Sequence, residues 1–230
     1  MREIASDLRR WRKRGVDEIA LATIVETRGS SLRPAGARMA LTESGEVAGS
    51  VSGGCVDGDV VAEMEAVLNR DLELRRLSFG ISDQEAWESG LSCGGALDLL
   101  VECWDPLHDV LIREIEARQS VGFASRTDHP AHRLRKADGT TLGSLGSAAL
   151  DDRVVADMMD VWPGPHAEKH QYPEGEVFVE VIPPPLKLFI FGATDIARYL
   201  APMARLMDFE VVVSDARRAF LNEARFPRVE

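Results

Sequence analysis

Residues 50–59 read SVSGGCVDGD, and the predicted fold is built outward from this segment. A run with strand character, Glu46 to Ser52, leads into two glycines and Cys55. The residues that follow place apolar side chains at helical spacing, namely Val60, Val61, Met64, Val67 and Leu68. This order predicts a strand, a glycine turn and a helix, with Cys55 at the helix entrance. Amides in the first turn of a helix have no partner within it, so the position favours an anion or a thiolate.

A second cysteine flanked by glycine, Cys93, stands in residues 91–95, which read LSCGG. For either loop alone the alternative is a plain turn with a buried cysteine, because glycine pairs make turns and cysteine is often a small core residue. Two such loops in one chain favour a binding site. The third cysteine, Cys103, lies in an apolar run and is expected in the core. The binding residues expected from the two loops are Ser52, Gly53, Gly54, Cys55, Ser92, Cys93, Gly94 and Gly95.

A third candidate loop follows the apolar run Ile19 to Val25, which is typical of a buried strand. Residues 27–38 read TRGSSLRPAGAR and interleave arginines with glycines and hydroxyls. Guanidinium groups, hydroxyls and backbone amides together can hold a phosphate or a carboxylate. The alternative is a polar surface loop, which a local excess of arginine in an acidic chain makes the weaker interpretation. The binding residues expected here are Arg28, Gly29, Ser30, Ser31, Arg33 and Arg38.

Composition excludes several classes of function. The 230 residues are 45% hydrophobic and 28% charged, which is typical of a globular protein. A formal charge of −11 argues against a broad nucleic-acid surface or an anionic membrane as partner. No apolar run approaches the roughly 20 residues that span a bilayer, and the charged start of the chain lacks the apolar core of a signal peptide. Three cysteines without a Cys-x-x-Cys pair indicate a reducing compartment, so we expect a cytoplasmic protein.

Three consecutive prolines, residues 183–185, mark a boundary because they fit neither a helix nor a central strand. We expect residues 1–107 to form a mixed α/β domain that carries the glycine and cysteine loops. Residues 108–183 should continue it, with helices over His108–Gln119 and Val154–Trp162. Four histidines in polar, turn-rich stretches are assigned no metal, namely His129, His132, His166 and His170.

Residues 184–230 begin with an apolar run that ends at a glycine, followed by a helical pattern and a second strand before Asp215. This is the β-α-β order of a dinucleotide-binding fold, with Asp215 where a ribose partner stands. Thr194 occupies the place of the middle glycine, so the candidate nucleotide residues are Gly192, Thr194 and Asp215. The fold class expected for the chain is α/β, an N-terminal mixed α/β domain followed by an incomplete Rossmann-like β-α-β unit. Its open sheet edges favour a homodimer.

These motifs, in this order, resemble the XdhC/CoxI family of accessory proteins for molybdenum hydroxylases such as xanthine dehydrogenase. The matching segments are residues 27–31, 34–39, 49–56, 91–95 and 177–184. The resemblance implies a non-catalytic factor that binds the molybdenum cofactor (molybdopterin), holds it while a sulfido ligand is installed, and delivers it to a hydroxylase client. It also implies a cysteine desulfurase as partner. The three loops would hold the pterin phosphate, and Cys55 or Cys93 would reach the molybdenum.

Two other functions stay open from the residues alone. An NAD(P)-dependent oxidoreductase would rest on residues 186–215, but Thr194 at the phosphate turn and the lack of an acid–base set nearby disfavour NAD(P). A thiol redox protein would need Cys55 and Cys93 close enough to bridge, with α-carbons less than about 7 Å apart.

Overall fold

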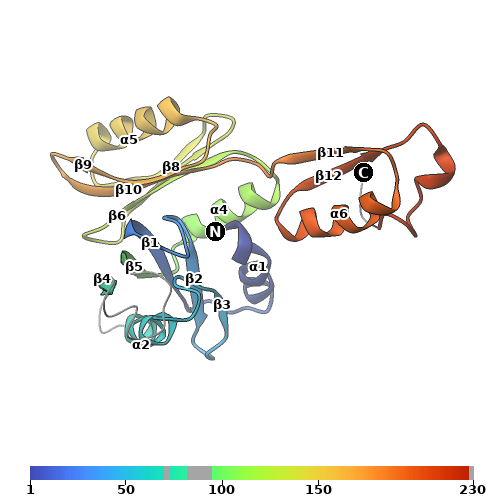
Figure 1. Ribbon diagram of the computed structural model, residues 1–230. Coiled ribbons are helices and arrows are strands. Elements are labelled where there is room, and N and C mark those ends of the chain that lie inside the picture. Colours follow the sequence, from blue (N-terminus) through green and yellow to red (C-terminus); the bar gives the residue numbers. More distant parts are fainter. Residues whose placement is uncertain (70–72, 82–94, 228–230) are drawn as a thin grey trace. The chain divides into compact units, whose positions relative to one another are not determined.

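The chain forms two compact units, Met1–Pro183 and Pro184–Glu230, and each is described by itself. The computed structural model describes residues 1–69, 73–81 and 95–227 (Figure 1). Residues 1–107 and 108–183, expected as successive domains, lie together in the first unit. The position expected to separate them falls inside helix α4, Pro106–Glu116, whose turns bridge the two parts.

The first unit contains two antiparallel five-stranded sheets. The first sheet has the order β3-β2-β1-β5-β4, built from β1 Ile19–Gly29, β2 Arg38–Thr42, β3 Val47–Gly49, β4 Leu74–Ile81 and β5 Gly95–Cys103. The second has the order β8-β7-β6-β10-β9, built from β6 Val121–Arg126, β7 His132–Lys136, β8 Thr141–Gly143, β9 His166–Tyr172 and β10 Gly175–Ile182. The two sheets have the same plan, a central strand flanked by hairpin partners.

One helix covers the outer face of each sheet (Figure 1). Helix α2, Asp57–Leu68, buries Val60, Met64 and Val67 against the first sheet. Helix α5, Ala148–Val161, buries the apolar side chains Leu150, Val154 and Met158 against the second. Helix α1, Ala5–Lys13, follows the short 3₁₀ turn Arg2–Ile4, and it packs with α4 into the core between the sheets. Burial of such side chains stabilises each layer by about 1.5–3 kcal/mol per residue.

Capping side chains move two helix starts upstream of the apolar patterns. The helix predicted from His108 begins at Pro106, because Asp105 accepts a hydrogen bond from the Leu107 amide at 2.7 Å. The helix predicted from Val154 begins at Ala148, where Ser147 accepts from the Leu150 amide at 3.2 Å. Among the described residues, no helix combines the length and the apolar character needed to cross a membrane.

Two groups of buried polar residues lie within the core of the first unit. The guanidinium of Arg38 on β2 pairs with the carboxylate of Glu180 on β10, joining the two sheets. Nearby, Glu102 on β5 meets two imidazoles, with Nε2 of His132 at 3.3 Å and Nε2 of His108 at 3.9 Å. Burial raises the pKa of Glu102 to about 8 and lowers the pKa of His132 to about 4, so all three groups are neutral near pH 7.

The second unit is a β-α-β arrangement of β11 Lys187–Phe191, α6 Asp195–Leu206 and β12 Glu210–Ser214, followed by the 3₁₀ turn Arg218–Phe220. The two strands are parallel, with Phe189 opposite Val212. Helix α6 buries its alanine face against β12 (Ala197, Ala201, Ala204), and its opposite face carries exposed apolar side chains. Together, the two units confirm the predicted α/β class with a Rossmann-like β-α-β segment.

The titration of Glu102 gives the first prediction, tested with the variant Glu102→Gln. Because burial raises the pKa of Glu102 from 4.5 to about 8, the folded chain binds an extra proton here between those values. The stabilising contribution of protonated Glu102 is therefore complete below about pH 4.5 and is lost as the pH rises through about 8. Relative to Glu102→Gln, the wild-type free energy of unfolding should fall across this window by up to about 1.4 kcal/mol per pH unit.

Urea unfolding of both proteins at a series of pH values measures this difference. Other titrating groups contribute to both proteins, so the comparison isolates residue 102. A wild-type advantage that stays constant from acid to alkaline pH would show that this carboxyl is ionised in the fold.

Candidate functional site

The loop at residues 50–57 is organised by the carboxylate of Asp57, the first residue of α2. It accepts hydrogen bonds from Ser50 Oγ at 2.6 Å, from Ser52 Oγ at 2.7 Å and from the Ser52 amide at 3.0 Å. The two hydroxyls in turn accept from the amides of Gly53, at 2.8 Å, and Val56, at 2.9 Å. Burial opposes ionisation of Asp57, but these hydrogen bonds outweigh it and lower its pKa. The loop is therefore tied to the start of the helix by its own side chains.

Cys55 lies at the outermost part of this loop. Its side chain is exposed, and the glycines before it have positive φ, +74° at Gly53 and +113° at Gly54. Among hydrogen bonds between described residues, none involves the amide of Gly54 or Cys55. The helix begins two residues after Cys55, and its first turn carries Asp57 and Asp59. The strand, glycine turn and helix predicted here are present, with the thiol before the helix rather than within its first turn.

The structure brings parts of all three candidate loops together. Gly53 faces the arginine loop, because a methyl group on Gly53 would lie 3.4 Å from Cδ1 of Leu32. Gly95 begins β5 opposite Gly29 of β1. A methyl group on Gly95 would lie 2.1 Å from the carbonyl oxygen of Ser30, so only glycine fits there. The residues Ser92, Cys93 and Gly94 lie outside the described residues.

The three arginines of the candidate loop have different surroundings. Arg28 donates to Asp98 at 3.0 Å and Arg33 pairs with Glu3, both at the surface. Arg38 is buried, with its side chain 2% exposed, and its guanidinium is held by Glu180 and by the carbonyl of Gly36. The prediction that Arg38 faces a ligand is therefore wrong, because its charge is neutralised in the core. Ser31 donates to the carbonyl of Arg33 at 2.7 Å and shapes the loop.

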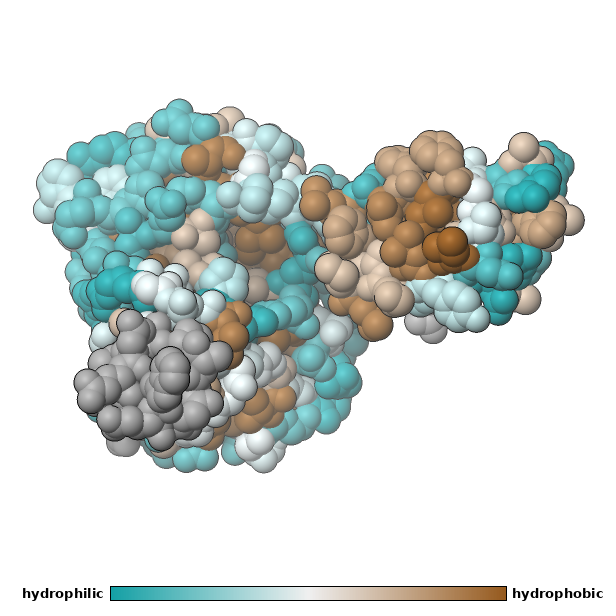
Figure 2. All heavy atoms as spheres, in the orientation of Figure 1, coloured by the Kyte–Doolittle hydropathy of each residue, from teal (hydrophilic) through white to brown (hydrophobic). Residues whose placement is uncertain are grey.

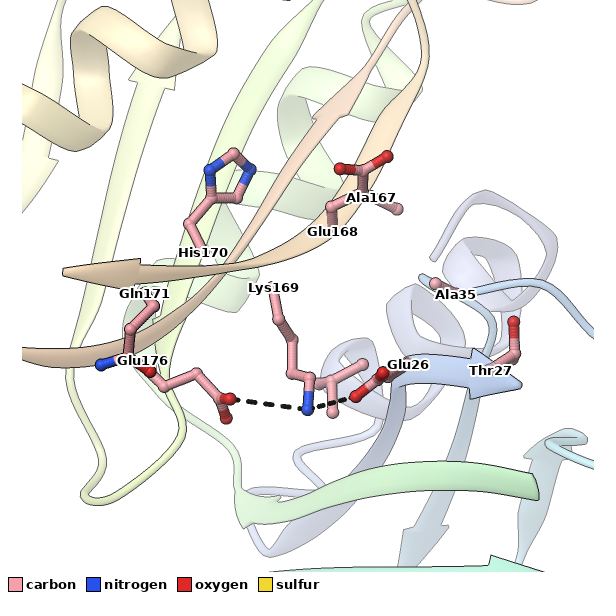
Figure 3. A pocket seen from close by; sticks show the side chains of 10 residues that line it. Glu26, Thr27, Ala35, Ala167, Glu168, Lys169, His170, Gln171 and Glu176 are labelled. Carbon is pink, nitrogen blue, oxygen red and sulfur yellow. Dashed lines mark ion pairs between the residues drawn. The ribbon is translucent and has the colours of Figure 1, made fainter.

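A groove of about 570 Å³ runs between β1 and β9, at a place the sequence analysis did not single out (Figure 3). Lys169 reaches across it to Glu26, with 2.5 Å between Nζ and Oε2, and lies 3.5 Å from Glu176. Burial disfavours the ammonium, but the hydrogen bond to Glu26 and the surrounding carboxylates raise the pKa of Lys169. The groove is a polar contact between the two sheets, and its lysine is occupied by these carboxylates.

In the second unit, the predicted nucleotide residues make contacts with one another's segments. Thr194 is the N-cap of α6 and accepts from the Ala197 amide at 3.3 Å. The Asp215 carboxylate accepts from the Ala193 amide, which follows Gly192, at 2.8 Å. The Arg217 side chain donates to the same carboxylate at 2.8 and 2.9 Å and, with backbone amides, lowers its pKa. The group expected to meet a ribose is thus engaged by the protein.

Comparison with known proteins bears on both units. A model of the XdhC and CoxI family matches residues 11–80, and a model of the XdhC Rossmann domain matches residues 188–230. The resemblance to the XdhC/CoxI family is confirmed by these matches.

Two curated relatives and one solved structure are similar to the chain. It is 27% identical over 220 residues to a protein of Bacillus subtilis (strain 168) named as a probable xanthine dehydrogenase subunit, covering 93% of this chain and 64% of that protein. It is 37% identical over 109 residues to the molybdenum cofactor insertion chaperone PaoD of Escherichia coli (strain K12), covering 45% of this chain and 32% of PaoD. A crystal structure described as a xanthine dehydrogenase from Bacillus halodurans matches with a TM-score of 0.73 and 25% identity, covering 100% of this chain and 66% of that one. The chain thus spans less than two thirds of the length of these two curated relatives.

The contact between Gly95 and Ser30 is tested by Gly95→Ala. The added methyl would clash with the Ser30 carbonyl oxygen, a backbone atom that cannot swing aside. We expect a loss of about 1–3 kcal/mol in the free energy of unfolding, measured in urea. The matched control is Gly58→Ala in α2, where nothing lies within 4 Å of the new methyl and alanine should stabilise the helix. Equal stability of the two variants would contradict the close approach of these loops.

Proposed function

We propose that this protein is an accessory factor that binds the molybdenum cofactor and holds it for sulfuration and insertion into a molybdenum hydroxylase of the xanthine dehydrogenase type. The observation that carries the proposal is the exposed Cys55 loop lying beside the arginine loop, in a chain matched by the family model over residues 11–80. The name of the similar PaoD, a cofactor insertion chaperone, supports the same role.

The residues present suit an anionic, sulfur-rich ligand. The amides of Gly54 and Cys55 are donors without partners among the described residues, and successive amides in such a turn make an anion-binding concavity. We assign the phosphate of the pterin to these amides and to the hydroxyl and guanidinium groups of Ser30, Arg28 and Arg33. The thiol of Cys55, and that of Cys93, would approach the molybdenum, because thiolates are ligands for soft metal centres. The cofactor supplies its own redox chemistry, and the protein binds, orients and shields it.

NAD(P) has no part in this proposal. The Asp215 carboxylate is already held by Ala193 and Arg217, and Thr194 caps the helix where a pyrophosphate would approach. The residues that would be needed for hydride transfer are not grouped near this turn among the described residues, which favours a non-catalytic factor over an oxidoreductase.

We propose three partners for this protein, which we place in the cytoplasm. The hydroxylase client receives the cofactor, a cysteine desulfurase supplies the sulfur, and a second copy of the chain covers the apolar face of the second unit. That face carries Ile196, Tyr199, Met203 and Leu206 on α6, each more than half exposed, and the corresponding surface of Figure 2 is brown. Apolar area of this kind is unfavourable in water and marks interaction surfaces.

Replacement of Cys55 tests the proposed function. After purification from cells that make the cofactor, Cys55→Ala should retain several-fold less molybdenum and pterin than the wild type, while its thermal midpoint stays unchanged because the side chain is exposed. Cys103→Ala is the control, since Cys103 packs against the core and its Sγ contacts the Val67 carbonyl at 3.6 Å. That variant should lose stability and keep the cofactor. Unchanged molybdenum in Cys55→Ala would remove Cys55 from the site.

The dimer is tested by charge on the exposed face of α6. The double variant Met203→Glu, Leu206→Glu should convert a dimer into a monomer in light scattering, because burying two carboxylates in the interface is costly. The control places the same charges on apolar residues of the first unit that are 49% and 43% exposed, Val47→Glu and Met159→Glu. A wild-type protein that is already monomeric at high concentration would refute the dimer.

A further inference from the structure

Among the described residues, two clusters of histidine and carboxylate bring three ligand atoms close together. One is buried, Glu102 with His108 and His132, and the other is partly exposed on β9, His166 with Glu168 and His170. We propose that the β9 cluster binds a divalent transition-metal ion of the Zn²⁺ type. This site is separate from the loops assigned to the molybdenum cofactor.

The strand geometry of β9 creates the cluster. Residues two apart on a strand point to the same face of the sheet, so His166, Glu168 and His170 line one side. The remaining residues Ala167 and Lys169 face the groove toward β1, and Figure 3 shows Lys169 directed away from His170. On the first side, the two imidazoles lean toward each other over Glu168, and the ligand atoms of all three lie within 4.8 Å of one another.

The separation of the imidazoles fits shared coordination. The Nε2 atoms of His166 and His170 lie 3.1 Å apart. Two nitrogens bound to one tetrahedral Zn²⁺ at about 2.0–2.1 Å are about 3.3 Å apart, which is the edge of the tetrahedron. A carboxylate oxygen from Glu168 supplies the third ligand, and the fourth position stays open to water. Two nitrogens and one oxygen are ligands that suit Zn²⁺ and its neighbours rather than Mg²⁺ or Ca²⁺.

A carboxylate behind His170 orients that ring. Oδ2 of Asp157 on α5 lies 4.0 Å from Nδ1 of His170 and accepts a hydrogen bond from the hydroxyl of Tyr172. The negative charge favours the proton on Nδ1, which leaves the lone pair of Nε2 directed at the proposed ion. Metal-binding histidines commonly have such a carboxylate on the ring nitrogen that does not bind the metal. The His170 side chain is 29% exposed, so an ion can reach it.

The buried cluster fails the same test. Nδ1 of His108 accepts a hydrogen bond from the Asp105 amide at 3.0 Å, as part of the cap of α4. A neutral imidazole that accepts at Nδ1 carries its proton on Nε2, the atom that faces Glu102, so that nitrogen has no lone pair for a metal. Only Glu102 and His132 remain as donors, which is too few for a closed site. The tautomers therefore favour β9.

The simplest alternative for β9 is a hydrogen bond between two neutral imidazoles, which would have the same 3.1 Å separation. Zinc titration of the full-length chain by calorimetry, at neutral pH and in the Cys55→Ala background to remove the exposed thiol, distinguishes the two. One equivalent should bind, and His166→Ala or His170→Ala should weaken binding by more than about 100-fold, beyond the loss typical of an outer-sphere partner. Asp157→Asn, which acts through His170, should weaken it by about 10–100-fold.

The control is His129→Ala, because His129 is half exposed and lies outside the cluster. Its zinc affinity should equal that of the parent. Cobalt(II) added in place of zinc should give the visible bands of a four- or five-coordinate nitrogen and oxygen site without a sulfur charge-transfer band. Zinc binding that is absent at millimolar concentration, or that is unchanged in the His166→Ala, His170→Ala double variant, would overturn the proposal.

Discussion

The buried ion pair between Arg38 and Glu180 is the constraint on which the first unit depends. Both side chains are at most 3% exposed, and the guanidinium donates to both carboxylate oxygens, with 3.0 Å between Nη1 and Oε2. Removing two charges from water is costly, and loss of one partner from such a pair typically costs about 3–5 kcal/mol. The pair therefore tolerates only the arrangement of the two sheets in which β2 and β10 present these groups to each other.

This pair also holds one end of the arginine loop. Arg38 donates to the carbonyl of Gly36 at 3.1 Å, and the amide of Gly36 donates to the carbonyl of Ile24 at 2.8 Å. The loop thus returns to the strand it left, and its middle, at Ser30 and Leu32, is pressed against Gly95 and Gly53. A residue deep between the sheets therefore positions a surface loop, although it touches nothing that binds there.

Local pattern was sufficient for some elements and insufficient for others. The strand, glycine turn and helix around Cys55 and the β-α-β order after the prolines were predictable, because spacing of apolar residues and glycines determines both. The role of Arg38 was not, since its partner lies 142 positions away and periodicity carries no record of it. The histidines of β9 were also misjudged, because the polar sequence of an edge strand resembles a turn-rich stretch. The starts of α4 and α5 depend on the caps Asp105 and Ser147 rather than on apolar spacing.

The surroundings of the three arginines decide which of them can serve an anion. Arg28 is 55% exposed in its pair with Asp98, and the pair of Arg33 with Glu3 is also at the surface. Exposed pairs of this kind contribute about 0–1 kcal/mol, so an incoming phosphate can replace the carboxylate at little cost. The pair of Arg38 cannot be exchanged, because it would leave Glu180 charged and alone in the core. In a chain with a net charge of −11, anion recognition at these loops therefore rests on two exchangeable arginines and on the unpaired amides beside Cys55, and the carboxylates that hold those arginines keep the loops ordered before a ligand arrives.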